Sequence, residues 1–243
     1  MSYLLKSRRE PTLHEHAASE EQQAKINEVR ELLGDLRTEM PVFLSDATIR
    51  RFLRARNWST VQATKTLKEA VKWRRQYKPE MIRWSLTSGK EQVKQLVYNL
   101  ENFTMSSESA QDNVVWVVDF RGWKLSSTPL AETRQSLNII QNYYPGLVAV
   151  AILCNPPKIF ESFWKIVNYF IEPEMREKVK FVYTNNSESQ RIMADMFDLD
   201  KLECAFGGRN TTGIDIVEYS ERMRKRDQVR GASTNANANA SSS

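Results

Sequence analysis

The sequence predicts an α/β protein in which an N-terminal helical subdomain packs on a mixed, mostly parallel sheet with crossover helices. Before residue 84, apolar side chains recur at helical spacing. After it, short apolar runs alternate with helical patterns, as in sheets whose strands are joined by helices. One run, at residues 113–120, is almost continuously apolar, which is typical of a parallel strand covered on both faces.

Composition divides the 243 residues into four parts. We expect residues 1–18 to be disordered, because they mix charge, proline and histidine without periodicity. A helical subdomain should follow over residues 19–84, and a strand–helix domain over residues 85–222. The tail at residues 223–243 begins basic and ends in a low-complexity run, so we expect it to be disordered as well.

The helical subdomain should contain three helices. In the first, apolar residues share one side: Ile26, Val29, Leu33 and Leu36. Asp46 can cap a second helix that runs to Arg54. A third helix begins after Ser59 and ends at Pro79, because proline cannot continue a helix.

The strand–helix domain alternates its element types at the spacing of crossover connections. The expected strands lie at residues 113–120, 147–154, 178–183 and 213–217. The expected helices lie at residues 130–143, 160–171 and 187–197. This order favours parallel strands joined by helices around a buried core.

Composition also excludes several classes of protein. No apolar run is long enough to span a bilayer, and the first ten residues are too charged for a secretory signal. We therefore expect a cytoplasmic protein. The net charge of +5 suits either nucleic acid or an anionic lipid surface. Nucleic-acid binding would place basic and aromatic residues together, whereas the aromatic residues here lie in apolar stripes.

Catalytic and metal-binding residues are sparse. The two histidines, His14 and His16, lie in the N-terminal segment, which leaves the expected fold without a histidine base or a multi-histidine metal site. Cys154 and Cys204 form no zinc-type pair and are interpreted as small buried residues. We therefore expect no catalytic residue, no metal and no cofactor.

The helix expected at residues 160–171 has one unusually aromatic face. The residues on this face are Phe160, Phe163, Trp164, Val167, Phe170 and Ile171. Such a stripe is more often ordinary core than a ligand contact. A lid over a lipid pocket would use the same residues, because an acyl chain is an apolar core component that the ligand supplies. Spacing alone leaves both interpretations open.

An arginine cluster lies at the end of the second helix. Arg56 projects beside an apolar face formed by Ile49, Phe52 and Leu53. Three other arginines point elsewhere and are expected to be solvated: Arg50, Arg51 and Arg54. An arginine beside an apolar face needs a partner, because an unpaired buried charge is costly. That partner is either a structural carboxylate or the phosphate of a headgroup.

Several segments together resemble the CRAL-TRIO lipid-binding family, which includes phosphatidylinositol/phosphatidylcholine transfer proteins. The N-terminal matches are Ile49-Arg-Arg-Phe-Leu-Arg-Ala-Arg56 and Val71-Lys-Trp-Arg-Arg75. The later matches are Asp119-Phe-Arg-Gly122, Gln141-Asn-Tyr-Tyr-Pro145, Asn155-Pro-Pro157 and Phe206-Gly-Gly208. They occur in the family's order and near its spacing, from about Asp46 to Tyr219.

The resemblance implies a two-lobed fold in which a gating helix, matched by residues 160–171, covers a lipid pocket. It implies one bound phospholipid, whose phosphate is contacted by Arg56 and Lys178. The aromatic face of the gating helix would line the acyl pocket. The resemblance also implies lipid transfer between membranes, so we expect a monomeric, cytoplasmic protein that contacts membrane surfaces transiently.

Two departures from the family's pattern limit this expectation. Family members normally carry a strand pair before the helix that matches residues 92–103, and here that segment is shortened, which would expose a sheet edge. Members that bind phosphoinositides have other groups where this chain has Asn57, Gly146 and Met175. These departures favour generic phospholipid binding over phosphatidylinositol specificity. The alternative is a non-transferring interaction or regulatory module with an incomplete pocket.

Overall fold

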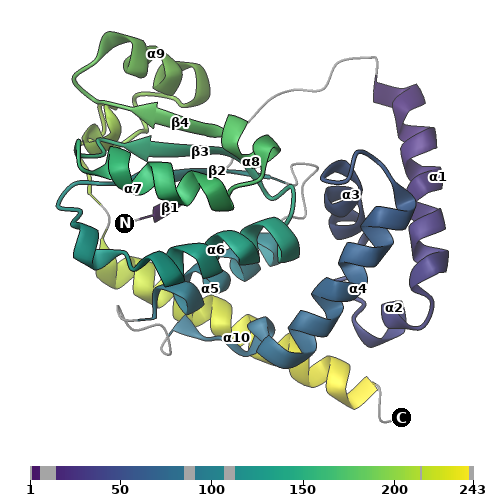
Figure 1. The fold of residues 1–243 in the computed structure, drawn as a ribbon. Helices are drawn as coiled ribbons and strands as arrows, with labels where there is room; N and C mark the ends of the chain where they lie inside the picture. Colours follow the sequence, from purple (N-terminus) through teal and green to yellow (C-terminus); the bar gives the residue numbers. More distant parts are fainter. Residues whose placement is uncertain (1, 6–14, 85–90, 107–112, 214, 241–243) are drawn as a thin grey trace.

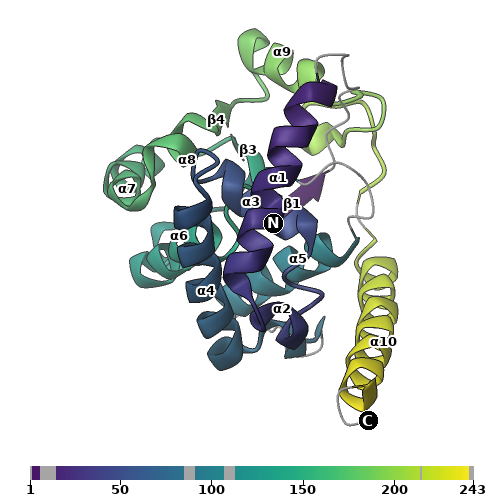
Figure 2. The same ribbon diagram turned by 90° about the vertical axis from the view of Figure 1, so that its right-hand side faces the viewer.

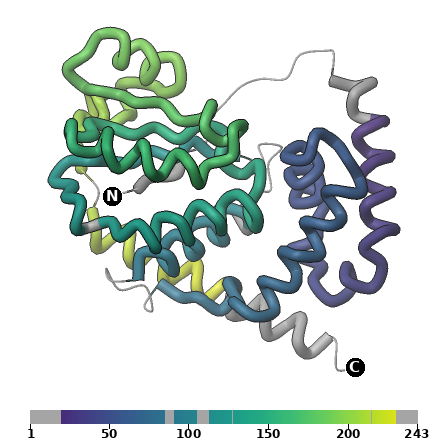
Figure 3. The backbone as a smooth tube through the Cα atoms, viewed as in Figure 1, coloured from purple at the N-terminus to yellow at the C-terminus, as the bar shows by residue number. Residues whose placement is uncertain are grey.

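A helical lobe and a sheet lobe lie side by side in the computed structural model (Figure 1). The structure describes residues 2–5, 15–84, 91–106, 113–213 and 215–240. The same two lobes are visible in the tube of Figure 3. The predicted α/β fold with an N-terminal helical subdomain is confirmed.

The helical lobe consists of α1 Glu15–Leu33, α2 Leu36–Glu39, α3 Asp46–Arg54 and α4 Thr60–Tyr77. Apolar side chains of α1, α3 and α4 form its core, with Ile26, Val29, Phe52, Leu53 and Leu67 among them. Ser59 caps α4, because its side chain accepts a hydrogen bond from the backbone N of Gln62. α4 ends at Lys78, which has a left-handed φ of 53° and precedes Pro79.

Within the described residues, the sheet has the strand order β1-β2-β3-β4. The strands are β1 Ser2–Leu5, β2 Val114–Asp119, β3 Val148–Cys154 and β4 Val179–Val182. β2, β3 and β4 are parallel, as the alternation of strands and helices predicts. The register pairs Val117 with Ile152 and Leu153 with Phe181. β1 runs antiparallel to β2.

Helices cover both faces of this sheet, so that alternate strand residues face different layers. The helices of the sheet lobe are α5 Gln92–Ser106, α6 Leu130–Tyr143, α7 Phe160–Val167, α8 Pro173–Glu177, α9 Ser187–Met196 and α10 Ile216–Ala240. Short 3-10 turns lie at η1 Pro79–Met81, η3 Leu125–Ser127, η4 Asn168–Phe170 and η5 Cys204–Phe206. Val115 and Val117 share a core with α9 and η5. Val114 and Val148 face α5 and α6, while Leu153 faces α7.

The N-terminal segment contradicts the disorder expected for residues 1–18. Ser2–Leu5 forms β1, and α1 already begins at Glu15. β2 is an apolar strand, and the unpaired N–H and C=O groups along its outer edge accept a partner strand readily. β1 pairs with residues 115–118 and covers this part of the edge, which the shortened segment before residue 92 was expected to leave exposed.

The C-terminal segment differs from expectation too. Residues 213–217, of which the structure describes all but residue 214, do not form the predicted strand. α10 replaces both that strand and most of the tail that was expected to be disordered. The carboxylate of Asp215 accepts hydrogen bonds from two backbone N–H groups of the first turn and so starts the helix. Residues 1, 6–14 and 241–243, which also belong to the expected disordered ends, lie outside the described residues.

Two side chains of α10 attach it to α5. Met223 is buried, although the sequence places it in the expected disordered tail. Asp227 accepts a hydrogen bond from the hydroxyl of Tyr98 at 3.0 Å and another from the backbone N of Trp84 at 2.7 Å. Figure 2 shows α10 and α7 on opposite sides of the molecule, so this attachment is remote from the predicted lid.

A buried ion pair joins the two lobes. Arg74 of α4 donates two hydrogen bonds to the carboxylate of Glu101 in α5, both at 2.8 Å. The hydroxyl of Tyr144, which follows α6, donates a third bond to this carboxylate at 2.6 Å. All three side chains are almost inaccessible to water, so each depends on the others for its hydrogen bonds. Next to them, Trp73 stacks on Tyr143 with 4.3 Å between ring centroids.

The protonation states of this network follow from its burial and charges. Burial lowers the pKa of Arg74, but the charge and hydrogen bonds of Glu101 outweigh this effect and raise the pKa above its ordinary value. Burial, reinforced by the charge of Glu101, raises the pKa of Tyr144 well above its ordinary value. Arg74 is therefore charged and Tyr144 neutral at physiological pH.

We predict that Arg74→Met lowers the free energy of unfolding by about 3–5 kcal/mol, because it leaves a buried carboxylate without its cationic partner. Arg75 is the matched control, since it is the next residue of α4 and pairs with Glu39 at the surface. Arg75→Met should cost less than about 1 kcal/mol. Urea unfolding followed by circular dichroism measures both values, and equal losses would contradict a special role for Arg74.

The two cysteines differ in exposure, which corrects the interpretation of both as buried residues. Cys154 at the end of β3 is buried, whereas Cys204 is exposed at the start of η5. Burial, reinforced by the charge of Asp119, raises the pKa of Cys154 to about 12. Because the thiolate is the reactive form, Cys154 is protected both by its burial and by its protonation.

We predict that the folded protein reacts with a single equivalent of an aromatic disulfide reagent at about pH 8. Cys204→Ser should abolish this reaction, and Cys154→Ser should leave it unchanged. Absorbance of the released thiol measures both variants, before and after unfolding in urea. Rapid reaction of Cys154 in the folded Cys204→Ser variant would show that the end of β3 is accessible.

Candidate functional site

The predicted lid forms a shorter α-helix than expected. α7 ends at Val167, and the chain then tightens into η4 before it becomes extended at Ile171. Pro173 explains the extended backbone directly before α8, because a proline disfavours helical backbone in the preceding residue, and Glu172 has a ψ of 145°. Residues 160–171 are therefore not one continuous α-helix.

The aromatic face of α7 packs inward against the sheet. We use the term aromatic cluster for Phe120, Trp123, Phe160, Phe163, Trp164 and Phe181. Phe160 lies 4.5 Å from Phe120 and 5.4 Å from Trp123, measured between ring centroids. Trp164 meets Phe181 edge to face at 5.3 Å. The rings touch one another, so this face of α7 is core in the structure.

The structure brings together all but one of the residues predicted for the acyl pocket. Phe160, Phe163, Val167 and Ile171 are buried in one apolar group, and Trp164 packs against it while partly exposed. Phe170 lies apart from this group. Its ring is partly exposed and lies 5.2 Å from the guanidinium carbon of Arg134 on α6.

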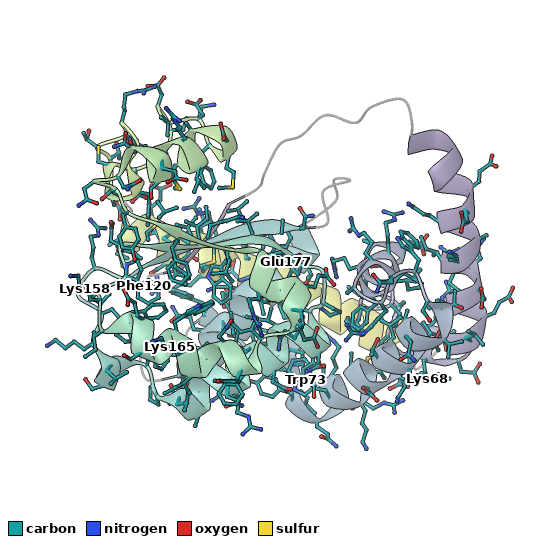
Figure 4. The ribbon with its side chains drawn as sticks, turned by 45° about the horizontal axis from the view of Figure 1, so that its top comes forward. Lys68, Trp73, Phe120, Lys158, Lys165 and Glu177 are labelled. Atoms are coloured by element: carbon teal, nitrogen blue, oxygen red, sulfur yellow. The ribbon has the colours of Figure 1, made fainter. Side chains whose placement is uncertain are left out.

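The outer face of α7 and η4 is exposed and partly apolar. Ile159 is 58% exposed, Ile166 48% and Tyr169 88%. Lys158 and Lys165 are exposed on the same segment (Figure 4). The segment therefore has an apolar inner face in the core and a mixed apolar and basic face toward solvent. No helix among the described residues is long and apolar enough to cross a membrane.

Arg56 and Lys178, the two cations predicted to contact phosphate, line one small cavity. The cavity has a volume of about 30 Å³ and lies between the two lobes. Its described lining residues are Ala55, Arg56, Ile140, Gln141, Tyr144, Pro145, Gly146, Val148, Glu172, Glu174, Met175 and Lys178. Arg56 comes from the turn after α3, and Lys178 follows α8. We call this space the charged cavity.

Each of these cations has a carboxylate partner. The Nζ of Lys178 lies 2.8 Å from an Oε1 of Glu174, within one turn of the chain. Nη1 of Arg56 lies 4.0 Å from Oε2 of Glu172. The carboxylate that the sequence left open as a partner of Arg56 is therefore present, and the pairs are partly exposed to water. Surface pairs of this kind contribute little to stability.

Gly146 shows how closely the lobes approach at the charged cavity. Gly146 has a φ of +69°, and a Cβ built at this position would lie 3.0 Å from the carbonyl oxygen of Arg51. Arg51 itself is only 4% exposed, and its guanidinium donates a hydrogen bond to Thr48 at 2.9 Å. The expectation that Arg51 is solvated is thus wrong, because the sheet lobe covers the end of α3.

Gln141 is a residue of this site for which the sequence predicts no role of its own. Its buried side chain donates a hydrogen bond to the carbonyl oxygen of Phe170 at 3.0 Å and accepts one from the backbone N of Glu172 at 2.7 Å. The Gln141 amide is therefore hydrogen-bonded to the backbone on both sides of Ile171, between η4 and α8. The sequence signal for such a role is its position at the start of the family-like segment Gln141-Asn-Tyr-Tyr-Pro145.

A larger groove lies elsewhere on the molecule. It has a volume of about 490 Å³, and its described lining comes from α4 alone: Val61, Thr64, Lys65, Lys68, Glu69 and Lys72. None of these is a predicted site residue, and Lys68 points away from the sheet lobe in Figure 4. Among the described residues, no three His, Cys, Asp or Glu side chains are grouped to hold a metal ion.

Comparisons with known proteins identify relatives of this chain. The phosphatidylinositol transfer protein PDR17 of Saccharomyces cerevisiae is 24% identical over 199 residues, which are 63% of this chain and 57% of PDR17. The SEC14 cytosolic factor of Kluyveromyces lactis is 25% identical over 243 residues, 78% of this chain and 79% of that protein. The chain thus spans little more than half the length of PDR17.

Fold and family are shown by two further comparisons. The crystal structure of Sfh5 aligns with a TM-score of 0.51 at 14% identity, over 91% of this chain and 99% of the other, which supports the fold. Residues 53–208 match the model of the CRAL/TRIO domain. This match covers most of the chain and includes the aromatic cluster and the charged cavity. The chain belongs to the CRAL/TRIO domain family.

Proposed function

We propose that this protein binds one phospholipid molecule, with its headgroup at the charged cavity and its acyl chains beneath α7, and carries it between membranes. The observation that carries the proposal is the meeting of Arg56 and Lys178 in one cavity, although they lie far apart in sequence. Family membership supports it, and so do the names of two relatives, the phosphatidylinositol transfer protein PDR17 and the SEC14 cytosolic factor. No chemical reaction is part of the proposal.

The charged cavity suits the phosphate of a lipid. A guanidinium and an ammonium group both donate hydrogen bonds to phosphate oxygens, and such charge-assisted bonds are stronger than neutral ones. Arg56 and Lys178 are partly shielded from water, which strengthens their attraction for an anion relative to fully solvated cations. Their present partners are surface carboxylates, which phosphate can replace at little cost.

Met175 links the headgroup end of the proposed site to its acyl end. Its side chain lines the charged cavity and also packs against the apolar group beneath α7. An acyl chain that extends past Met175 would separate α7 from Phe120 and Phe181. Apolar contacts are non-directional, so methylene groups can replace the ring contacts that are lost.

The same packing favours the second candidate, a non-transferring interaction or regulatory module. The rings of the aromatic cluster already fill the space beneath α7 with their mutual contacts. A protein that keeps this arrangement would retain the fold without carrying a lipid. The two candidates differ in one observable, which is the presence of a stoichiometric lipid.

The outer face of α7 suits the membrane contact that transfer requires. Exposed Ile159, Ile166 and Tyr169 can enter the interface of a bilayer, where apolar and aromatic side chains are stabilised. Lys158 and Lys165 would meet anionic headgroups at the same surface. In this proposal the protein is a cytoplasmic monomer that associates with membranes peripherally and transiently.

We predict that native mass spectrometry of the gently purified protein shows one phospholipid per chain. Arg56→Ala and Lys178→Ala should each weaken lipid pickup from vesicles by about tenfold, because each removes a charged hydrogen-bond donor to phosphate. Lys180→Ala is the control, since Lys180 is an exposed cation on neighbouring β4 that does not line the cavity. Protein that carries no lipid under any of these conditions would favour the non-transferring module.

We predict that Ile166→Glu and Tyr169→Glu each reduce binding to vesicles of phosphatidylcholine and phosphatidylserine by about tenfold, because a carboxylate is poorly accommodated in the bilayer interface. Val61→Glu is the control, since Val61 is 68% exposed on α4 in the other lobe. Sedimentation with vesicles measures the bound fraction. Equal binding of all three variants would show that the outer face of α7 does not contact the membrane.

A further inference from the structure

A tight turn after β2 determines where Trp123 lies. The backbone N of Trp123 donates a hydrogen bond to the carbonyl oxygen of Phe120 at 3.0 Å, and Gly122 between them has a φ of +71°. A type II turn requires such a φ at its third position, where glycine adopts it without strain. The turn reverses the chain, so the indole packs back against Phe120 with 5.9 Å between ring centroids. Figure 4 shows Phe120 on the side of Lys158 and remote from Glu177 of α8.

A hydrogen bond fixes the orientation of the indole. Its Nε1–H donates to Oγ1 of Thr128 at 2.8 Å. Thr128 directly precedes Pro129, the N-cap of α6, so this acceptor does not belong to α7. The indole also contacts Phe160 and Phe163 of α7, at 5.4 and 5.6 Å between ring centroids. Trp123 is therefore anchored outside α7 and packs against it from the end of β2.

Trp123 lies at the end of the apolar group that is remote from the charged cavity. The register of β2 and β3 pairs Val114 with Val148, which lines the cavity, and pairs Asp119 with Cys154 at the other end. With a rise of about 3.3 Å per residue, the two ends of β3 are about 20 Å apart. The acyl layer of one bilayer leaflet is about 15 Å deep, half of the hydrocarbon core. An acyl chain whose headgroup lies in the cavity would therefore end near Trp123.

Opening of α7 would leave Trp123 in place. Phe160 and Phe163 move with α7, whereas both hydrogen bonds of Trp123 are made to residues outside that helix. The indole is partly exposed, so it stands between the buried rings and solvent. A longer acyl chain would have to displace the indole or leave methylene groups in water, and either loses apolar burial.

We infer that Trp123, oriented by Thr128, sets the upper limit of the acyl chain length that the protein accepts. In this arrangement the terminal methyl group of the acyl chain meets the indole. Trp123 is a specificity-determining residue, and Thr128 is a positioning residue that acts through it. This inference rests on the proposed function, since it concerns the acyl end of the same lipid site.

The test is a competition among phosphatidylcholines that differ only in acyl chain length. The protein is incubated with vesicles that contain equal amounts of dipalmitoleoyl, dioleoyl and dieicosenoyl phosphatidylcholine, repurified and analysed by native mass spectrometry. Trp123→Ala should raise the bound ratio of dieicosenoyl to dipalmitoleoyl lipid by about tenfold over the unsubstituted protein, because additional methylene groups become buried. All variants extract lipid from the same vesicles, so the cost of extraction cancels in this comparison.

Thr128→Val tests the orientation of the indole with a smaller change. Valine has nearly the shape of threonine but cannot accept the hydrogen bond from Nε1, so the indole is free to rotate. This variant should shift the ratio in the same direction by a smaller factor. Thr133→Val is the matched control, since the Thr133 hydroxyl on α6 donates to the carbonyl oxygen of Pro129 at 3.1 Å. It should keep the ratio of the unsubstituted protein.

Circular dichroism verifies that each variant is folded, and Thr128→Val decides the test if Trp123→Ala does not fold. Two results would overturn the inference: an unchanged ratio in a folded Trp123→Ala or Thr128→Val variant, and an equal shift in Thr133→Val. In both cases lipid is still bound, so the proposed function stands while the limit of chain length lies elsewhere. If neither the variants nor the unsubstituted protein carries lipid, the proposed function fails and this inference fails with it.

Discussion

The buried pair of Arg74 and Glu101 constrains how the two lobes are placed. Their hydrogen bonds lie where water does not reach, so a shift of α4 against α5 would leave charges unpaired at high cost. Tyr144 attaches the segment before β3 to the same carboxylate. Arg56 comes from the helical lobe and Lys178 from the sheet lobe, so the shape of the charged cavity depends on how the two lobes are placed.

A second constraint acts on α7 and the chain after it, which the proposed function requires to open. α7 contacts the sheet through rings, whereas the chain after it is held by polar bonds to its backbone: Gln141 bonds on both sides of Ile171, and Arg176 donates to the carbonyl oxygens of Asn168 and Ile171. Apolar contacts can be exchanged for a ligand, but backbone hydrogen bonds are directional. Motion of α7 would therefore turn about a fixed point near Ile171, beside the charged cavity.

The chain ends show how remote contacts override local composition. Residues 2–5 have no apolar periodicity of their own, yet β1 pairs with the edge of β2 because that edge has unpaired backbone groups. α10 contains a polar, basic sequence, but Met223 and Asp227 meet partners on α5 and before it. The sequence pattern of neither segment indicates which part of the chain it contacts, so both were expected to be disordered.

The sequence by itself determined the helical subdomain, the parallel strands, the aromatic stripe and the family, because these follow from periodicity and from motifs in a fixed order. It placed Arg56 beside an apolar face and left its partner open. Only the tertiary structure decided that partner, the burial of Arg51 and the closeness of Gly146 to α3, since each depends on how two lobes meet. Side-chain contacts between segments distant in sequence leave no periodic pattern in either one.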